Sequence, residues 1–431
     1  MLKTTYISDV WGMPEGSRVE LLGWLRSRRS HGRLIFLDLR DSTGVMQVAV
    51  KGGIADPQSM EVAASAAREA LLSVEGVVRS EARAPSGVEL SASRVRVLSG
   101  VARDFPIRRG IGARALWDNR HLHLRSPRVS ALMRVRARLL KAIRGWFERN
   151  NFIEVNCPTF ITAAVEGGAT LFKVDYFGRE AYLTQSVQFY QEAAIYGLEK
   201  VFSIQPSFRA EKSKTRRHLT EFWHVEAEIA HAGLEDLMRV VERLVGESSI
   251  EALQESRREL EVLGRHPRFD ELEPPYDRVR YSEALEILES KGVQIAWGSD
   301  LGADEERVLT QDFERPFFLT HFPREAKAFY HRIDPSDSRV TLSADLLAPK
   351  GYGEVVGGGE RISSLGELLE RIKADGLNPA DYEWYVDLRR YGSVQHVGFG
   401  LGLERVLQWL LELKSIKSAC LFPRTRARIY P

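Results

Sequence analysis

The chain has 431 residues, which is longer than one ordinary domain, so two or three domains are expected. Hydrophobic residues make up 44% and charged residues 28%, a composition that excludes a disordered or fibrous protein. Lysine plus arginine number 61 against 59 for aspartate plus glutamate, so the bulk charge does not point to a nucleic-acid partner.

No apolar run approaches the roughly 20 residues that a bilayer-spanning helix needs. Residues 1–18 also lack the apolar region of a signal peptide. Cys157 and Cys420 are the only cysteines, too few for a disulfide framework or a cysteine zinc site. We therefore expect no membrane partner and a location in a reducing cytoplasm.

The first 102 residues predict a small β-barrel. Strand patterns occur at 19–27, 34–41, 44–50, 71–80 and 88–96, and an alanine-rich helical stretch at 60–72 separates the third from the fourth. Five strands with a helix before the fourth predict an OB-fold, which commonly binds oligonucleotides, although an SH3-like barrel fits the same pattern. A basic strip between Trp24 and Arg40 suits a phosphate backbone, or is a solvated strand face.

A connector and a second, larger domain follow the barrel. Residues 103–128 have few periodic apolar positions and are broken by proline and glycine, which predicts a linker. A strong amphipathic helix is predicted at about 129–149, with apolar residues at Leu132, Val135, Leu139, Ile143 and Phe147. No boundary is evident from 129 to 431, within which residues 232–310 are predicted to be a mostly helical insertion.

The segment 201–230 predicts an antiparallel hairpin. Apolar and polar residues alternate with period two on both sides of a basic loop, Lys212 to His218. One face of this hairpin collects polar and aromatic candidates: Arg209, Glu211, Phe222, Glu226 and Glu228. An ordinary half-exposed hairpin has the same alternation, so the pattern alone does not define a site.

Three glycines at alternate positions, Gly398, Gly400 and Gly402, strip one face of a predicted strand before a helix. Glycine weakens a strand, and we interpret the repeat as room for a closely approaching ligand. Arg405 lies in the first turn of the following helix, where the helix dipole disfavours a cation unless an anion is nearby.

Together these segments resemble the motifs of class II aminoacyl-tRNA synthetases. FRAE at 208–211 matches motif 2, GFGLGLER at 398–405 matches motif 3, and FIEVNCPTF at 152–160 matches motif 1. There is no GxxxxGK[ST] loop, which argues against a P-loop ATPase. Further strings, such as LTQSVQFYQEA and GYGEVVGGGERI, are similar to the asparaginyl and aspartyl enzymes of subclass IIb, so the resemblance covers nearly the whole chain.

The resemblance implies an α+β fold, in which an OB-fold anticodon-binding domain precedes a catalytic domain built on an antiparallel sheet flanked by helices. It implies ATP as a substrate and Mg²⁺ as its metal, held by Asp345 and Glu354. The implied ATP-binding residues are Arg209, Glu211, Arg217, His218, Phe222, Glu354, Gly402 and Arg405. Of these, Arg209, Arg405 and Glu354 are the implied catalytic residues, because fixed charge and alignment serve the in-line attack of a carboxylate on the α-phosphorus.

The resemblance also assigns the amino acid and the tRNA. The implied amino-acid-binding residues are Glu166, Gln185, Gln188, Glu228 and Arg361, and the implied anticodon-binding residues are Arg26, Phe36, Arg40 and Gln47. Without the resemblance, Phe36 would be interpreted as a barrel-core aromatic. Motif 1 implies a homodimer.

Asparagine is favoured over aspartate, because aspartate would place a carboxylate beside Glu228 as well as Arg361. In the competing interpretation, Glu226 and Glu228 serve only as metal or salt-bridge partners. The alternative functions are an aspartate-activating enzyme that charges both tRNA types, an asparagine-forming paralogue and a non-catalytic RNA-binding descendant. The departures from the family pattern cluster near the substrate: Gly359, Glu360, Gln395 and Val397. Among them, Glu360 is expected to add a negative charge next to Arg361.

Overall fold

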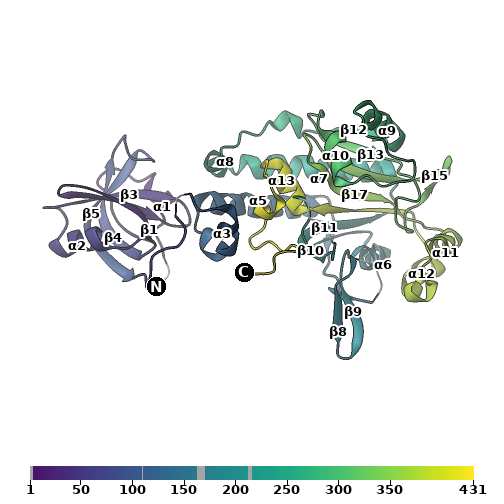
Figure 1. The fold of residues 1–431 in the computed structure, drawn as a ribbon, viewed down its shortest axis with the longest axis horizontal. Helices are drawn as coiled ribbons and strands as arrows, with labels where there is room; N and C mark the ends of the chain where they lie inside the picture. The colour runs from purple at the N-terminus through teal and green to yellow at the C-terminus, as the bar shows by residue number, and fades with distance from the viewer. Residues whose placement is uncertain (1–2, 109, 163–169, 212–215) are drawn as a thin grey trace. The chain divides into compact units, whose positions relative to one another are not determined.

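The computed structural model describes residues 3–108, 110–162, 170–211 and 216–431. The chain divides into two compact units, residues 1–130 and 131–431, each with its own apolar core (Figure 1). Within the described ranges, no helix combines the length and the apolar character needed to cross a membrane.

The first unit is a closed five-stranded barrel. Its strands are β1 (Arg18–His31), β2 (Leu34–Arg40), β3 (Val45–Lys51), β4 (Leu71–Ser80) and β5 (Val88–Ser99), in the order β1-β2-β3-β5-β4. The short helix α1 (Ile7–Val10) precedes the barrel, and α2 (Pro57–Ser65) separates β3 from β4. This is the predicted OB-fold arrangement.

The helix α2 lies earlier in the chain than the predicted stretch at 60–72. The Asp56 side chain accepts a hydrogen bond from the Ser59 amide at 2.7 Å, and Pro57 occupies the first helical position, so the helix begins there. It ends at Ser65, since Leu71 already belongs to β4. The cap and the proline therefore decide where the helix lies.

The predicted linker at 103–128 contains two short helices, α3 (Ala113–Asp118) and α4 (Arg120–His123). None of the α3 residues is buried, and Arg120 is the one buried residue of α4. Helices that bury so little surface leave no apolar period in the sequence, which is why the pattern did not reveal them.

The second unit is built on an eight-stranded sheet in the order β12-β13-β16-β17-β18-β11-β10-β6. All neighbours are antiparallel except the pairs β12/β13 and β10/β6. Its strands are β6 (Ile153–Glu154), β10 (Lys200–Phe208), β11 (Glu221–Ala230), β12 (Asp277–Arg280), β13 (Phe317–Thr320), β16 (Ser343–Ala348), β17 (Gly353–Glu360) and β18 (His396–Gly402). Two small sheets accompany it: β7 (Phe160–Ile161), β9 (Arg179–Leu183) and β8 (Lys173–Tyr176), and β14 (Ile333–Asp334) with β15 (Asp337–Thr341).

Helices cover one face of this sheet and enclose the main core. The predicted amphipathic helix is α5 (Pro127–Arg149), and its Leu132, Val135, Leu139, Ile143 and Phe147 are all buried. They pack with α7 (Leu234–Gln254), α13 (Leu403–Leu410) and inward-facing sheet residues such as Phe202 and Val225. The opposite face of the sheet is thereby left for the site.

In the part of the chain that the structure describes, the second unit contains six further helices and three 3-10 turns. They are α6 (Gln188–Leu198), α8 (Arg257–Leu263), α9 (Tyr281–Ser290), α10 (Ala303–Thr310), α11 (Leu365–Ala374) and α12 (Glu383–Arg390), with 3-10 turns η2 (Phe269–Glu271), η3 (Pro379–Tyr382) and η4 (Ile416–Ala419). The segment 232–310 is mostly helical, and its strand β12 joins the edge of the large sheet. It therefore shares the compact unit of residues 131–431.

Candidate active site

The hairpin β10–β11 and the neighbouring strand β18 form the floor of the site. The hairpin prediction is confirmed: β10 pairs antiparallel with β11 from Lys200 opposite Ile229 to Phe208 opposite Glu221. Along β11, Val225 and Ala227 lie in the helix-covered core. The residues that alternate with them, His224, Glu226 and Glu228, line a cavity on the other face. Because side chains alternate between the two faces of β11, these buried carboxylates lie on the face that lines the cavity.

Gly398 does not make room for a ligand, contrary to the interpretation of the glycine repeat, whereas Gly400 lines the cavity. Glu228 lies opposite Gly398 in the pairing of β11 with β18. A Cβ on Gly398 would collide with the Glu228 carboxylate, and a Cβ on Gly400 would collide with the His224 ring. These two glycines accommodate side chains of the chain itself. A Cβ on Gly402, in contrast, would come no closer than 3.5 Å to Arg405.

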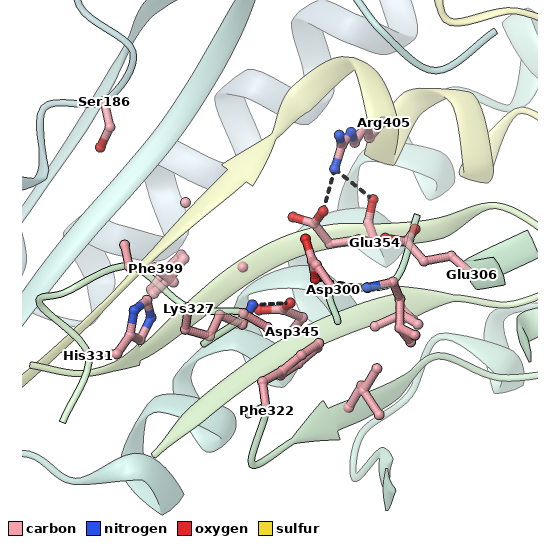
Figure 2. Close-up of a pocket in the computed structure, with 18 of the residues that line it drawn as sticks. Ser186, Asp300, Glu306, Phe322, Lys327, His331, Asp345, Glu354, Phe399 and Arg405 are labelled. Atoms are coloured by element: carbon pink, nitrogen blue, oxygen red, sulfur yellow. Dashed lines mark hydrogen bonds and ion pairs between the residues drawn. The ribbon is translucent and has the colours of Figure 1, made fainter. Parts of the chain in front are cut away.

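The cavity has a volume of about 810 Å³, within the range of ligand sites. A narrower pocket of about 60 Å³ adjoins it and shares eight of its lining residues, Arg209 and Arg405 among them. Figure 2 shows acidic and basic side chains from separate strands and loops converging on the larger cavity. Residues 300–306, from the predicted insertion, form part of its wall.

The structure brings together the residues predicted for ATP. Arg209, Glu211, Arg217, His218, Glu354 and Arg405 line both pockets, while Phe222 and Gly402 line the narrower one. That pocket also has apolar walls from Leu219 and Ile416. A slot with an aromatic ring, aliphatic walls and a guanidinium suits a flat heteroaromatic ring, and the adjacent cations suit its phosphates.

Arg405 has the anion that its position in the first turn of α13 requires. Its Nη1 lies 2.8 Å from Glu354 Oε2 (Figure 2). Burial acts to raise the pKa of Glu354, but the positive charges of Arg405 and Lys327 outweigh it and lower the pKa to about 2. Arg217 is held in the same way, by Glu306 at 2.7 Å.

Asp345 is the second carboxylate predicted to bind metal. Its Oδ2 accepts from Lys327 Nζ at 2.6 Å, while its buried Oδ1 has no hydrogen-bond partner within the described residues. A Cβ on Gly357 would lie 3.4 Å from this Oδ1 and 3.2 Å from Glu354 Oε1, so both oxygens approach one point. Carboxylate oxygens are the preferred protein ligands of Mg²⁺, so the two residues fit a magnesium ion. Burial is the main cause that raises the pKa of Asp345, to about 7.

The far end of the cavity contains a buried ion pair between Arg361 and Glu228. Arg361 Nη2 lies 2.7 Å and Nε 3.2 Å from Glu228 Oε1, and the two side chains are 4% and 1% exposed. Burial raises the pKa of Glu228 to about 7 despite the opposing charge of Arg361. In so buried a site, the two charges compensate each other, and any further polar group that contacts them must be complementary to them.

Not every residue predicted for the amino acid reaches this end. Gln188 lines the cavity. Gln185 is buried but does not line the cavity, and its Nε2 donates to Thr170 Oγ1 at 2.5 Å. The predicted Glu166 lies outside the described residues.

The departures from the family pattern lie near the cavity, and neighbouring groups compensate the negative charge that Glu360 adds next to Arg361. Glu360 is buried, pairs with Arg332 and accepts from Gln395 Nε2 at 2.9 Å, so its charge is compensated outside the cavity lining. A Cβ on Gly359 would lie 2.5 Å from the His331 ring, which explains the glycine. Val397 is a core residue.

The anticodon candidates lie on the outside of the barrel. Ile35, Leu37 and Leu39 of β2 are buried in the core of the barrel. Phe36 and Arg40 alternate with them along the strand and are half-buried. Phe36 is therefore not a core aromatic, and the Arg29 guanidinium lies 5.8 Å from its ring centre. Arg26 is exposed.

The other two candidates already have protein partners. Arg40 pairs with Glu69 at 3.0 Å, and its guanidinium lies 5.3 Å from the ring centre of the exposed Trp24. Gln47 is buried, accepts from Arg29 and donates to Glu89. Phe36 and Trp24 thus offer aromatic surface on a basic barrel face.

Five charged residues of the cavity had no predicted role: Asp300, Asp304, Glu305, Glu306 and Lys327. Lys327 lies outside the three class II motifs. Glu306 and Asp300 lie in the segment of unknown purpose, and a charged helical sequence gives no sign that it folds over a cavity.

A cavity lined by both acidic and basic side chains over a mainly antiparallel sheet, in a chain that also carries an OB-fold barrel, agrees with the architecture of a class II tRNA synthetase. The family model "tRNA synthetases class II (D, K and N)" matches residues 113–426, and the model "OB-fold nucleic acid binding domain" matches residues 19–98. The chain belongs to this class II family, and the predicted family and fold class are confirmed.

Within the family, the chain is most like asparagine enzymes. It is 51% identical to the asparagine–tRNA ligase of Pyrococcus abyssi over 435 residues, 100% of each chain. The crystal structure of asparaginyl-tRNA synthetase from Pyrococcus horikoshii complexed with asparaginyl-adenylate superposes with a TM-score of 0.97, at 48% identity over 100% of both chains. The asparaginyl-tRNA synthetase of Entamoeba histolytica in complex with asparaginyl-adenylate superposes with a TM-score of 0.89, at 33% identity over 97% of this chain and 98% of that one.

Proposed function

We propose that this chain activates asparagine with ATP and transfers it to tRNA, as an asparagine–tRNA ligase. The observation that carries the proposal is the buried Arg361–Glu228 pair at the far end of a cavity whose other end gathers Arg209, Arg217 and Arg405. The full-length similarity to asparagine–tRNA ligases supports it.

In the proposed reaction, the carboxylate of asparagine attacks the α-phosphorus of ATP and diphosphate leaves. Arg209 binds the α-phosphate and neutralises charge that develops on it. Phe222 and Arg405 hold the adenine ring between them, and Arg217 and His218 bind the outer phosphates. Glu211, Glu354 and Gly402 complete the ATP site. No covalent enzyme intermediate or general base is needed, since alignment and fixed positive charge lower the barrier.

Asp345 and Glu354 are the proposed ligands of Mg²⁺. Their converging oxygens above Gly357, and the buried Oδ1 of Asp345 that lacks a partner among the described residues, support this assignment. When bound, the ion supplies charge neutralisation and alignment for the phosphate oxygens. Lys327 holds the other oxygen of Asp345 and thereby fixes the orientation of the carboxylate.

Selection of asparagine is proposed to depend on both members of the Arg361–Glu228 pair. The Arg361 guanidinium donates to the side-chain carbonyl of asparagine, and the Glu228 carboxylate accepts from its amide nitrogen. Aspartate would bring a second carboxylate next to Glu228, which is unfavourable by several kcal/mol in a buried site, on the order of a thousandfold discrimination. Gln188, Gln185 and Glu166 are proposed to bind the rest of the amino acid.

The barrel is proposed to bind the anticodon through Arg26, Phe36, Arg40 and Gln47. A base stacked on an aromatic ring such as Phe36 contributes about 1–3 kcal/mol. We also propose a homodimer. Exposed apolar residues around the motif 1 strand, Ile153, Phe160 and Phe177, support it. Cys157 and Cys420 are free thiols, consistent with a reducing cytoplasm as the proposed location.

Amino-acid-dependent exchange of diphosphate into ATP, run in parallel with asparagine and aspartate, tests the proposal. Exchange with asparagine, followed by charging of tRNA with asparagine, is expected. Absence of exchange with asparagine would refute it. Comparable exchange with aspartate would instead favour the second candidate, an aspartate-activating relative, and asparagine formation from ammonia would identify a metabolic paralogue.

A further inference from the structure

Glu192, on α6, lies in a buried network that has no role in the reaction described above. It is fully buried, and its two oxygens accept hydrogen bonds from four donors on three elements. These donors are Gln188 Nε2 at 2.9 Å, Tyr385 Oη at 2.8 Å, Arg389 Nη2 at 2.6 Å and His396 Nε2 at 2.9 Å. A buried carboxylate that accepts hydrogen bonds from four donors is rigidly placed.

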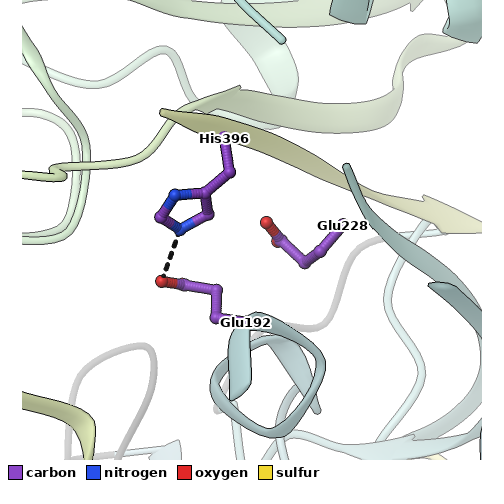
Figure 3. A group of neighbouring side chains, drawn as sticks. All are labelled: Glu192, Glu228 and His396. Atoms are coloured by element: carbon purple, nitrogen blue, oxygen red, sulfur yellow. Dashed lines mark hydrogen bonds and ion pairs between the residues drawn. The ribbon is translucent and has the colours of Figure 1, made fainter. Parts of the chain in front are cut away.

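Figure 3 shows Glu192, Glu228 and His396 gathered in one cluster, with Glu192 bonded to the His396 ring. The three groups offer ligand atoms within 4.8 Å of one another, which is a spacing that a metal ion could use. His396 Nδ1, however, lies 2.8 Å from the Val394 carbonyl, so both ring nitrogens face acceptors and carry hydrogens when both bonds form. Each carboxylate also pairs with an arginine. The cluster is therefore a charge-compensated network that disfavours another cation.

The bond between Glu192 and Gln188 has a defined polarity. Burial acts to raise the pKa of Glu192, but the charges of Arg389 and His396 outweigh it and hold the pKa below its ordinary value. An ionised carboxylate only accepts hydrogen bonds, so the amide nitrogen of Gln188 must be the atom turned toward it. The amide oxygen of Gln188, which lines the cavity, is then left for a donor there.

We infer that Glu192 is a positioning residue of the amino-acid site, which turns Gln188 so that its amide oxygen accepts from the α-ammonium group of the substrate. The inference rests on the proposed function. An amide free to rotate could present its NH₂ group to the ammonium instead, which would repel it. Glu192 therefore determines that the amide oxygen of Gln188, and not its NH₂ group, faces the substrate.

The same carboxylate has a second, measurable effect on Glu228. The charged groups that face Glu228 are Glu192 from α6, His396 from β18 and Arg361 after β17. Burial is the largest cause that raises the pKa of Glu228, and the negative charge of Glu192 adds to it. Removal of that charge should lower the pKa of Glu228, a change that loss of packing alone would not produce.

The test compares Glu192→Gln with Tyr385→Phe, which removes one donor but leaves the Glu192 charge and its bond to Gln188. In diphosphate exchange, Glu192→Gln is expected to raise KM for asparagine at least tenfold and leave KM for ATP within twofold. The acid limb of kcat/KM for asparagine should move to lower pH. The inhibition constant of succinamic acid, which lacks the α-amino group, should stay within twofold. Tyr385→Phe should stay within threefold of wild type throughout.

An unchanged KM for asparagine in folded Glu192→Gln would overturn the inference, and so would equal damage in Tyr385→Phe. If circular dichroism shows that Glu192→Gln does not fold, a crystal structure of the wild-type chain with asparagine decides. The α-ammonium within hydrogen-bond distance of Gln188 Oε1 supports the inference, and an ammonium bound elsewhere overturns it. Failure of the proposed function is distinguishable, because the wild-type chain itself would then show no asparagine-dependent exchange.

Discussion

The charged side chains at the two ends of the cavity differ in their exposure to water. At the nucleotide end, Arg405 and Glu354 are 24% and 32% exposed, and the neighbouring cations pair with carboxylates that a ligand can replace. At the amino-acid end, Arg361 and Glu228 are 4% and 1% exposed, and the Glu192 network behind them is sealed. Partial exposure keeps the nucleotide end adaptable, whereas burial makes the amino-acid end rigid.

This difference implies that the nucleotide end mainly contributes binding energy, whereas the amino-acid end mainly contributes selectivity. Charges near water are screened, so several cations must act together to hold a triphosphate. In a buried site, a substrate whose groups do not pair with the fixed charges has a strongly unfavourable binding free energy. Substitutions at the two ends should therefore fail in different ways.

The largest effect is expected for Arg209→Ala, at the nucleotide end. Exchange should fall at least about a thousandfold with any amino acid, because the charge that stabilises the reacting α-phosphate is lost. Steady-state exchange with saturating asparagine and ATP measures it. Arg216→Ala is the matched control, since Arg216 is exposed on the same loop and lines neither pocket. Activity near wild type in Arg209→Ala would remove Arg209 from the reaction.

A smaller and more selective effect is expected for Glu228→Gln, at the amino-acid end. The kcat/KM for asparagine should fall about 10²–10³-fold, because Arg361 loses its buried counter-charge and the substrate amide loses its charged acceptor. KM for ATP should stay within threefold, and the preference for asparagine over aspartate should shrink. Thermal unfolding serves as the control for folding. A variant that still discriminates fully would place the selection elsewhere.

The pH dependence of the reaction with asparagine should also report on Glu228. The pKa of Glu228 is raised to about 7, and its ionised form accepts from asparagine, so kcat/KM for asparagine should fall tenfold per pH unit below about pH 7. Glu228→Gln should lack this limb for asparagine, because glutamine does not ionise. A flat asparagine profile from pH 5.5 to 8 would contradict the role of Glu228.

The smallest effect is expected for Glu306→Gln. Glu306 Oε2 accepts from Arg217 at 2.7 Å and from the Glu354 amide at 2.9 Å, and glutamine can keep contacts without the charge. One negative charge fewer beside the triphosphate should lower KM for ATP roughly threefold, with KM for asparagine unchanged. An increased KM for ATP would mean that Glu306 mainly orients Arg217.

Much of the fold follows from local patterns. The five barrel strands and the hairpin at 201–230 were predicted because alternation of polarity reports one buried face directly. The family resemblance then named ten of the residues that line the cavity, Arg209, Glu354 and Arg405 among them. The linker helices α3 and α4 were not predicted, because they bury too few residues to produce a periodic apolar pattern in the sequence.

Long-range contacts explain what the sequence could not reveal. Glu228 and Arg361 are separated by 133 positions, and Glu192 and Arg389 by 197. No spacing rule connects such residues, so the positioning role of Glu192 and the charge compensation of Glu360 required the folded chain. The glycines of β18 show the same limit, since their repeat was visible but the side chains that fill the space belong to another strand.

The most direct measurement is a crystal structure with a non-hydrolysable analogue of asparaginyl-adenylate. Glu228 and Arg361 should both lie within about 3.2 Å of the side-chain amide, with the phosphate surrogate against Arg209 and the adenine between Phe222 and Arg405. An amide that contacts neither Glu228 nor Arg361 would contradict the assignment of selectivity to the buried end of the cavity.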